Sequence, residues 1–128
     1  MHPAEALFDT KPLVFTAHAA ESAYLRERIC AFVLGEGAVP VNPFMSLGYF
    51  LYGLAEKDLI RSANNNLVMR CDELWVFGER SDGVDVEVSF AQNSGIPIRW
   101  FEMDHYGEAI TERAEPRSQP TSPLRPEI

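Results

Sequence analysis

Two short stretches of this chain, residues 12–17 and 73–77, are almost entirely apolar and are too short for a typical helix. A strand with apolar side chains on both faces is buried on both, which is typical of a parallel sheet covered by helices. A segment with helical spacing of apolar residues follows each stretch, as the crossover between parallel strands requires. We therefore expect an α/β fold with a parallel sheet covered by helices on both faces.

Apolar spacing divides the rest of the chain into further elements. Strands are expected at residues 12–17, 37–42, 73–77 and 95–101, and helices at residues 20–34, 56–71, 83–94 and 104–113. Proline donates no backbone hydrogen bond, so the proline within residues 37–42 indicates a strand end or a sheet edge. We expect one domain at residues 12–113, a loose N-terminal arm at residues 1–11 and a disordered proline-rich tail at residues 114–128.

The formal net charge of −8 argues against a nucleic-acid polymer or an anionic membrane as the partner, since both attract basic surfaces. A phosphorylated small molecule is compatible with this charge, because backbone amides at a helix start hold phosphate locally. The chain has no apolar signal stretch and no run of membrane-spanning length. These features indicate a cytoplasmic protein.

The cysteines and histidines of the chain do not form a recognisable metal motif. Cys30 and Cys71 fall in expected helices, where one disulfide and two small buried hydrophobic residues are the alternatives. His2, His18 and His105 are scattered along the sequence. We expect no metal site and no cofactor.

A carboxylate falls where the helical pattern calls for an apolar residue. At about 100° per residue, the apolar side chains of residues 83–94 share one arc, and Glu87 lies in the middle of it. A buried carboxylate is costly unless it is paired, protonated or facing a cavity. This helix directly follows an apolar strand, where α/β sheets form their sites. Glu87 is thus the first candidate for chemistry, and the alternative is a carboxylate at the edge of the arc.

The loop before this helix has the composition of a helix start that binds an anion. Ser81 or Asp82 suits the N-cap, and Gly83 permits close approach of a ligand. Such caps are common without any ligand. A second polar residue, Asn64, interrupts the apolar stripe of the expected helix at residues 56–71.

Several short blocks carry a family resemblance. They are CDELWVFG at residues 71–78, SDG at residues 81–83, Glu87 with Ala91, GIP at residues 95–97, TAH at residues 16–18 and GAVPVNP at residues 37–43. Together they resemble the nucleoside 2-deoxyribosyltransferase-like superfamily, with bacterial and phage-type members closest. The resemblance covers roughly residues 13–101. It implies a flavodoxin-like or Rossmann-like three-layer sandwich with a four- to five-stranded parallel sheet, and a homodimer or larger homo-oligomer.

The resemblance also implies roles for individual residues. Glu87 matches the glutamate nucleophile that attacks the anomeric carbon of a deoxyribosyl group, and Ser81 matches a serine that contacts a 5′-phosphate. Asn64 stands where the superfamily has an aspartate, and Asp58 is the nearest acidic alternative. The remaining substrate-binding candidates are Thr16, His18, Asp82, Gly83 and Phe44.

His18 stands where these enzymes often carry a tyrosine, and a surface histidine is its alternative. Phe44 belongs to an aromatic segment with Tyr49, Phe50 and Tyr52, for which base stacking, core packing and an oligomer contact are the alternatives.

Three functions remain open from the sequence. The first is an N-glycosidic bond hydrolase or deoxyribosyltransferase-like enzyme that acts on a nucleoside or nucleotide through a glutamate nucleophile. The second is a non-catalytic nucleotide-binding or sensor module of the same fold, which Asn64 in place of an acid favours. The third is a structural or interaction protein.

Overall fold

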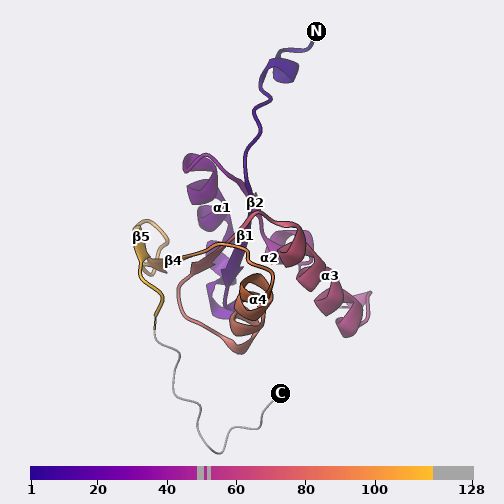
Figure 1. Ribbon diagram of the computed structural model, residues 1–128, viewed down its shortest axis with the longest axis vertical. Coiled ribbons are helices and arrows are strands. Elements are labelled where there is room, and N and C mark those ends of the chain that lie inside the picture. Colours follow the sequence, from indigo (N-terminus) through magenta and orange to yellow (C-terminus); the bar gives the residue numbers. More distant parts are fainter. Residues whose placement is uncertain (49–50, 52, 117–128) are drawn as a thin grey trace, which may run out of the picture.

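The structure is a computed structural model that describes residues 1–48, 51 and 53–116. Its sheet strands are β1 (Leu13–His18), β2 (Val39–Val41), β3 (Glu73–Phe77), β4 (Ile98–Met103) and β5 (Ile110–Arg113). The α-helices are α1 (Arg26–Gly35), α2 (Pro43–Ser46), α3 (Lys57–Arg70) and α4 (Asp82–Asn93), and the 3₁₀ helices are η1 (Pro3–Ala6) and η2 (Ala20–Leu25). Residues 1–12 are exposed and extend away from the body (Figure 1).

Within the described residues the sheet has five strands in the order β2-β1-β3-β4-β5. The first four are parallel and β5 pairs antiparallel with β4. This confirms the expected α/β three-layer fold, and the proline-containing strand lies at the sheet edge as predicted. The strand at residues 73–77 is confirmed residue for residue, and the helix expected at residues 83–94 begins one residue earlier.

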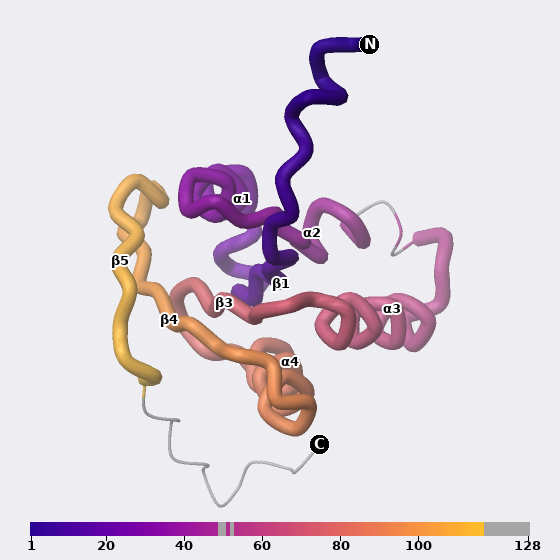
Figure 2. The backbone as a smooth tube through the Cα atoms, turned by 45° about the horizontal axis from the view of Figure 1, so that its top comes forward, coloured from indigo at the N-terminus to yellow at the C-terminus, as the bar shows by residue number. Residues whose placement is uncertain are grey.

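Helices cover both faces of the sheet (Figure 2). On one face α1 packs over a core that ends in a stack of aromatic rings: Val14, Leu25, Ile29, Val33, Ala38, Trp75, Phe77 and Phe101. On the other face α3 and α4 pack over a mainly aliphatic core: Phe15, Ala17, Val68, Cys71, Leu74, Val76, Val84, Val88, Ala91 and Trp100. Successive residues of a strand point to opposite faces, so β1 and β3 serve both cores.

The start of the first expected helix differs from the prediction. Residues 20–25 form the 3₁₀ helix η2, and the α-helix begins only at Arg26. Ala19, at the N-cap position, has no side chain that can accept a hydrogen bond from the first turn. Both Cys30 and Cys71 are free thiols, and Cys71 is buried.

The helix expected at residues 104–113 is wrong. Residues 104–109 instead form a turn into β5. The Asp104 carboxylate accepts hydrogen bonds from the amides of Glu108 and Ala109, at 2.8 and 3.1 Å, and Gly107 has a φ of 67°. Asp side chains compete in this way with helical hydrogen bonds, and a left-handed glycine ends helical geometry.

The carboxyl ends of β1 and β3 lie side by side, with His18 paired in register with Phe77. The chain leaves β1 toward α1 on one face and leaves β3 toward α4 on the other face. Such a switch point opens a crevice at the carboxyl edge of a parallel sheet. The residues after β1 and β3 are therefore placed where a ligand binds in folds of this type.

Among the described residues, no helix is long and apolar enough to cross a membrane, and no group of His, Cys, Asp and Glu is arranged to hold a metal ion.

Gly107→Ala should lower the free energy of unfolding by about 1–2 kcal/mol, the cost of a non-glycine residue in the left-handed region. A Cβ at this position would also lie 3.0 Å from Leu25 Cδ2 and 3.2 Å from Arg28 Cβ. Gly35→Ala is the matched control, because a Cβ added there would have no neighbouring atom within 4 Å and its φ is not positive. Urea denaturation that shows equal loss in both variants would contradict this account of the turn.

Candidate functional site

Glu87 is buried on the face of α4 that packs against the sheet and α3. Its side chain lies among Val84, Val88 and Ala91, and the residue is only 8% exposed. The Asn64 amide, from the middle of α3, donates a hydrogen bond of 2.7 Å from Nδ2 to Glu87 Oε2. The two polar residues that interrupted the predicted apolar stripes therefore meet each other.

Within the described part of the chain, the other carboxylate oxygen of Glu87 makes no polar contact. None of the described residues donates a hydrogen bond to Oε1, and none of their arginines, lysines or histidines forms an ion pair with Glu87. Burial raises the pKa of Glu87 to about 7 from an ordinary value of 4.5, and the hydrogen bond from Asn64 opposes this rise. Near neutral pH the carboxyl group thus exchanges readily between its acid and its anion.

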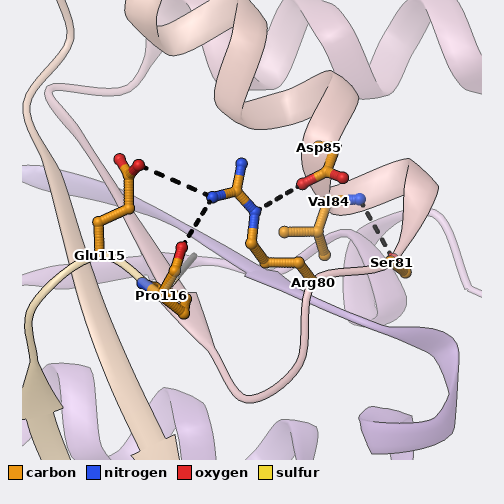
Figure 3. Close-up of polar contacts among 6 residues, drawn as sticks. All are labelled: Arg80, Ser81, Val84, Asp85, Glu115 and Pro116. Atoms are coloured by element: carbon orange, nitrogen blue, oxygen red, sulfur yellow. Dashed lines mark hydrogen bonds and ion pairs between the residues drawn. The ribbon is translucent and has the colours of Figure 1, made fainter. Parts of the chain in front are cut away.

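The start of α4 is held by two separate contacts (Figure 3). Ser81 is the N-cap, since its Oγ accepts a hydrogen bond of 3.2 Å from the Val84 amide. Arg80 donates from Nε to Asp85 at 2.7 Å, and its guanidinium lies 4.8 Å from the centre of the Trp100 ring. The loop between β3 and α4 is thereby fixed against both α4 and β4.

Arg80 also reaches the segment that follows β5. Its Nη1 lies 3.9 Å from Glu115 Oε2 and donates to the Pro116 carbonyl at 3.4 Å (Figure 3). Its helical partner Asp85 lies two residues before Glu87, about 200° around the helix axis. The Arg80 guanidinium therefore contacts the side of α4 that faces away from Glu87.

Asp82 and Gly83 form the first turn of α4 and are exposed. A Cβ added at Gly83 would meet only Ser81 Oγ, at 3.9 Å. The backbone at this helix start is therefore open to an approaching group, and its amides carry the positive end of the helix dipole.

Thr16 and His18 belong to a second, separate polar cluster at the carboxyl end of β1. Asn42 Nδ2 lies 2.8 Å from Thr16 Oγ1 and 3.0 Å from His18 Nε2, and its Oδ1 accepts from the Met45 amide at 3.2 Å. Thr16 Oγ1 in turn donates to the Val41 carbonyl. Asn42 thus caps α2 and ties β1 to β2.

His18 is neutral in this cluster. It is 4% exposed, and burial lowers its pKa to about 4. Because Asn42 Nδ2 is a donor, we assign Nε2 as the acceptor and place the proton on Nδ1, which lies 3.3 Å from the Ala19 carbonyl. The Phe44 ring packs against the imidazole, with ring centres 4.6 Å apart. No hydrogen bond within the described residues joins this cluster to Glu87.

Asp58 lies apart from both clusters. Its side chain is 81% exposed and pairs with Arg61 one turn along α3, at 3.1 Å. Of the aromatic segment, Tyr49, Phe50 and Tyr52 lie outside the described residues. Sequence reasoning missed Asn42, although an asparagine followed by Pro43 is a typical N-cap and first helical position.

Two hollows are lined by described residues. One, of about 350 Å³, lies at the carboxyl ends of β1, β3 and β4 beside Ala19, Gly78 and Met103. The other, of about 480 Å³, lies between Leu47 and α3, beside Leu59 and Arg70. Glu87 lines neither of them. Its carboxylate lies instead between α3 and α4, beside the Asn64 amide.

The sequence matches the family described as "Domain of unknown function (DUF7768)" over residues 15–101. A comparison with curated proteins finds no match. Among solved structures, the chain is similar to "2-desoxiribosyltransferase from Leishmania mexicana", with a TM-score of 0.57, 18% identity, and coverage of 73% of this chain and 65% of that one.

It is also similar to "Structure of Clostridium botulinum CMP N-glycosidase, BcmB", with a TM-score of 0.51, 19% identity, and coverage of 73% of each chain. The chain therefore spans slightly less than two thirds of the length of the first of these structures. At these identities the comparisons show a shared fold.

Glu87→Gln should stabilise the protein above pH 7 and leave its stability nearly unchanged at pH 4.5. The folded protein holds the Glu87 proton more tightly than the unfolded chain, so this group's contribution is present below pH 4.5 and lost as pH rises through about 7. The gain at pH 8 should be about 3 kcal/mol, because a pKa difference of one between the folded and unfolded states corresponds to about 1.4 kcal/mol. Glutamine keeps an oxygen that accepts from Asn64.

The measurement is the difference between the urea denaturation curves of the variant and the wild type across this pH range. The difference is needed because the lowered pKa of His18 changes wild-type stability with pH in the opposite direction. Glu27→Gln, an exposed carboxylate on α1, is the control and should give parallel curves. If the stabilities of Glu87→Gln and the wild type changed in parallel with pH, Glu87 would not be a buried carboxylate that lacks an ion-pair partner.

Proposed function

The chain belongs to the family described as "Domain of unknown function (DUF7768)", and from the geometry of Glu87 we propose that it cleaves N-glycosidic bonds of a nucleoside or nucleotide. In this proposal it acts as a hydrolase or as a deoxyribosyltransferase-like enzyme. The observation that carries the proposal is a buried carboxylate with one oxygen held by Asn64 and the other left for a reacting atom.

The proposed nucleophile is Glu87 Oε1. Asn64 fixes the plane of the carboxylate through Oε2, so that Oε1 is presented to the anomeric carbon in one orientation. As the bond to the base lengthens, positive charge develops on the sugar, and an adjacent carboxylate stabilises or captures it. Water, or a second base in a transfer reaction, then attacks the same carbon and releases Glu87.

The start of α4 is the proposed phosphate contact. Glu87 lies one to two turns from the open backbone at Asp82 and Gly83, and an anion at this terminus is favoured by the helix dipole. Ser81 orders this turn as its cap. A 5′-phosphate bound there would leave the anomeric carbon further along α4, in the direction of Glu87.

The names of the two structural neighbours, a deoxyribosyltransferase and a CMP N-glycosidase, both concern the bond between a sugar and a base. They support the reaction class of the proposal. The homo-oligomer implied by the resemblance is supported by exposed apolar side chains on α3 and α4, namely Leu59, Met69, Val86 and Phe90.

Glu87→Ala and Glu87→Gln should lower base release by roughly 10²–10⁴-fold, the range for loss of a positioned catalytic group. The assay is chromatography of free base after incubation with a panel of ribo- and deoxyribonucleoside monophosphates. Glu27→Gln should retain the wild-type rate, since its side chain lies on α1 over the opposite face. Equal rates in wild type and both Glu87 variants would refute the proposed role.

The non-catalytic binding module remains the second candidate, because the Asn64 amide cannot transfer a proton to a departing base. A nucleotide in large excess over its Kd should then stabilise the protein by a few kcal/mol. The stabilising nucleotide would be recovered intact after prolonged incubation. Thermal denaturation with and without each nucleotide, followed by chromatography, separates the binder from the enzyme.

A further inference from the structure

Glu87 is the only buried carboxyl group among the described residues. A glycosidase normally divides two tasks between two carboxyl groups, one that attacks the anomeric carbon and one that protonates the leaving group. Here the partner of Glu87 is the carboxamide of Asn64, which has no proton to transfer. One carboxyl group cannot be a nucleophilic anion and a proton donor in the same step.

His18, the other buried titratable group near the carboxyl edge, does not supply the missing proton. Nε2 is engaged by Asn42, and Nδ1 faces the Ala19 carbonyl. His18 is paired in register with Phe77, and side chains paired in this way point to the same face of the sheet. Phe77 packs under α1, so His18 lies on that face as well. Glu87 packs against the opposite face. The imidazole is therefore committed to the link between β1 and α2.

The remaining candidates at the start of α4 are equally unsuited. Ser81 Oγ serves as the helix cap, and a serine hydroxyl is not a proton donor of useful strength near neutral pH. Asp82 is exposed in the first turn, and it lies about 140° around the helix axis from Glu87. The described part of the site thus contains a nucleophile without a general acid.

The missing acid restricts the leaving group. A neutral nucleobase departs as an anion unless it is protonated, whereas a base that is already positively charged departs as a neutral molecule. From this site we propose that the chain acts on N-glycosides of permanently cationic heterocycles, such as nicotinamide nucleotides. This inference rests on the proposed function and specifies the substrate class of the same site.

The electrostatics of the site favour the same class. The Glu87 carboxylate has no cationic partner among the described residues, and a buried charge without a partner is unfavourable. A pyridinium N-glycoside brings a positive charge to within one bond of the anomeric carbon. The ligand would therefore supply the counter-charge that the fold omits, and a neutral base would not.

The reaction balances without a further participant. The bond between C1′ and the pyridinium nitrogen breaks, and its electron pair leaves with neutral nicotinamide. Glu87 Oε1 forms a bond to C1′, and this ester bond breaks when water attacks C1′. The products are the free base, the sugar phosphate and one proton, which passes from the attacking water to Glu87 and then to solvent.

Nicotinamide mononucleotide and its reduced form are the matched pair that tests this inference. They share the same sugar and phosphate, but the oxidised base is a cation and the reduced base is neutral. We expect base release from the oxidised form to exceed release from the reduced form, and from CMP and dCMP, by at least about 100-fold in kcat/KM, and to be lost in Glu87→Gln. Chromatography of free base at pH 7.5 gives each rate.

This assay distinguishes failure of the cationic substrate preference from failure of the glycosidase activity itself. Comparable release from oxidised and neutral substrates, lost in Glu87→Gln, would overturn the cationic preference and leave the glycosidase intact. No Glu87-dependent release from any of them would overturn both.

Asn64→Asp adds the missing acid and should raise release from CMP or dCMP at least tenfold at pH 5–6, relative to wild type. Unchanged release in this folded variant would show that a missing acid is not what limits neutral bases.

Discussion

The hydrogen bond from Asn64 to Glu87 is the contact on which the candidate site depends. It joins the middle of α3 to the second turn of α4 across a gap otherwise filled by aliphatic side chains. Apolar residues at both positions would extend the core and stabilise the fold, because burial raises the free energy of the carboxylate. The pair therefore lowers stability locally, as active sites commonly do, and the cost is tolerated because the helices around it are held by other means.

Those other means are concentrated at the start of α4. The Ser81 cap satisfies an orphan amide of the helix, while Arg80 joins Asp85, the Trp100 ring and Glu115 in one cluster. Because these groups lie on the flank away from Glu87, the helix is anchored without any cation entering the site. One carboxylate oxygen of Glu87 thus stays without a partner among the residues that the structure describes, while the helix backbone that carries it is held in place.

The strand that precedes α4 and the burial of Glu87 could be predicted from the sequence, because both follow from the spacing of apolar residues. The apolar run at residues 73–77 and the helical spacing that placed Glu87 on an apolar arc both report burial directly. The turn at Asp104 and the role of Asn42 were not accessible in this way. Each depends on one side chain bonded to backbone or to residues distant in sequence, and neither contact leaves a periodic trace. The helix predicted at residues 104–113 does not form, because the hydrogen bonds that the Asp104 side chain accepts from the backbone outweigh the helical spacing of apolar residues.

The two buried polar clusters differ in how completely their hydrogen-bonding groups are satisfied, and this difference bears on where a ligand can bind. Thr16, Asn42 and His18 saturate one another and the nearby backbone, so a ligand would have to break existing bonds to use them. Among the described residues, Glu87 has Asn64 as its one hydrogen-bond partner, and its Oε1 accepts no hydrogen bond. A ligand that contacts Glu87 Oε1 forms a new hydrogen bond or ion pair without breaking one in the protein. A ligand that contacts His18 must first break an existing hydrogen bond of the imidazole. The resemblance directs attention to both places, and the hydrogen bonds favour Glu87 as the reacting group and His18 as part of the scaffold.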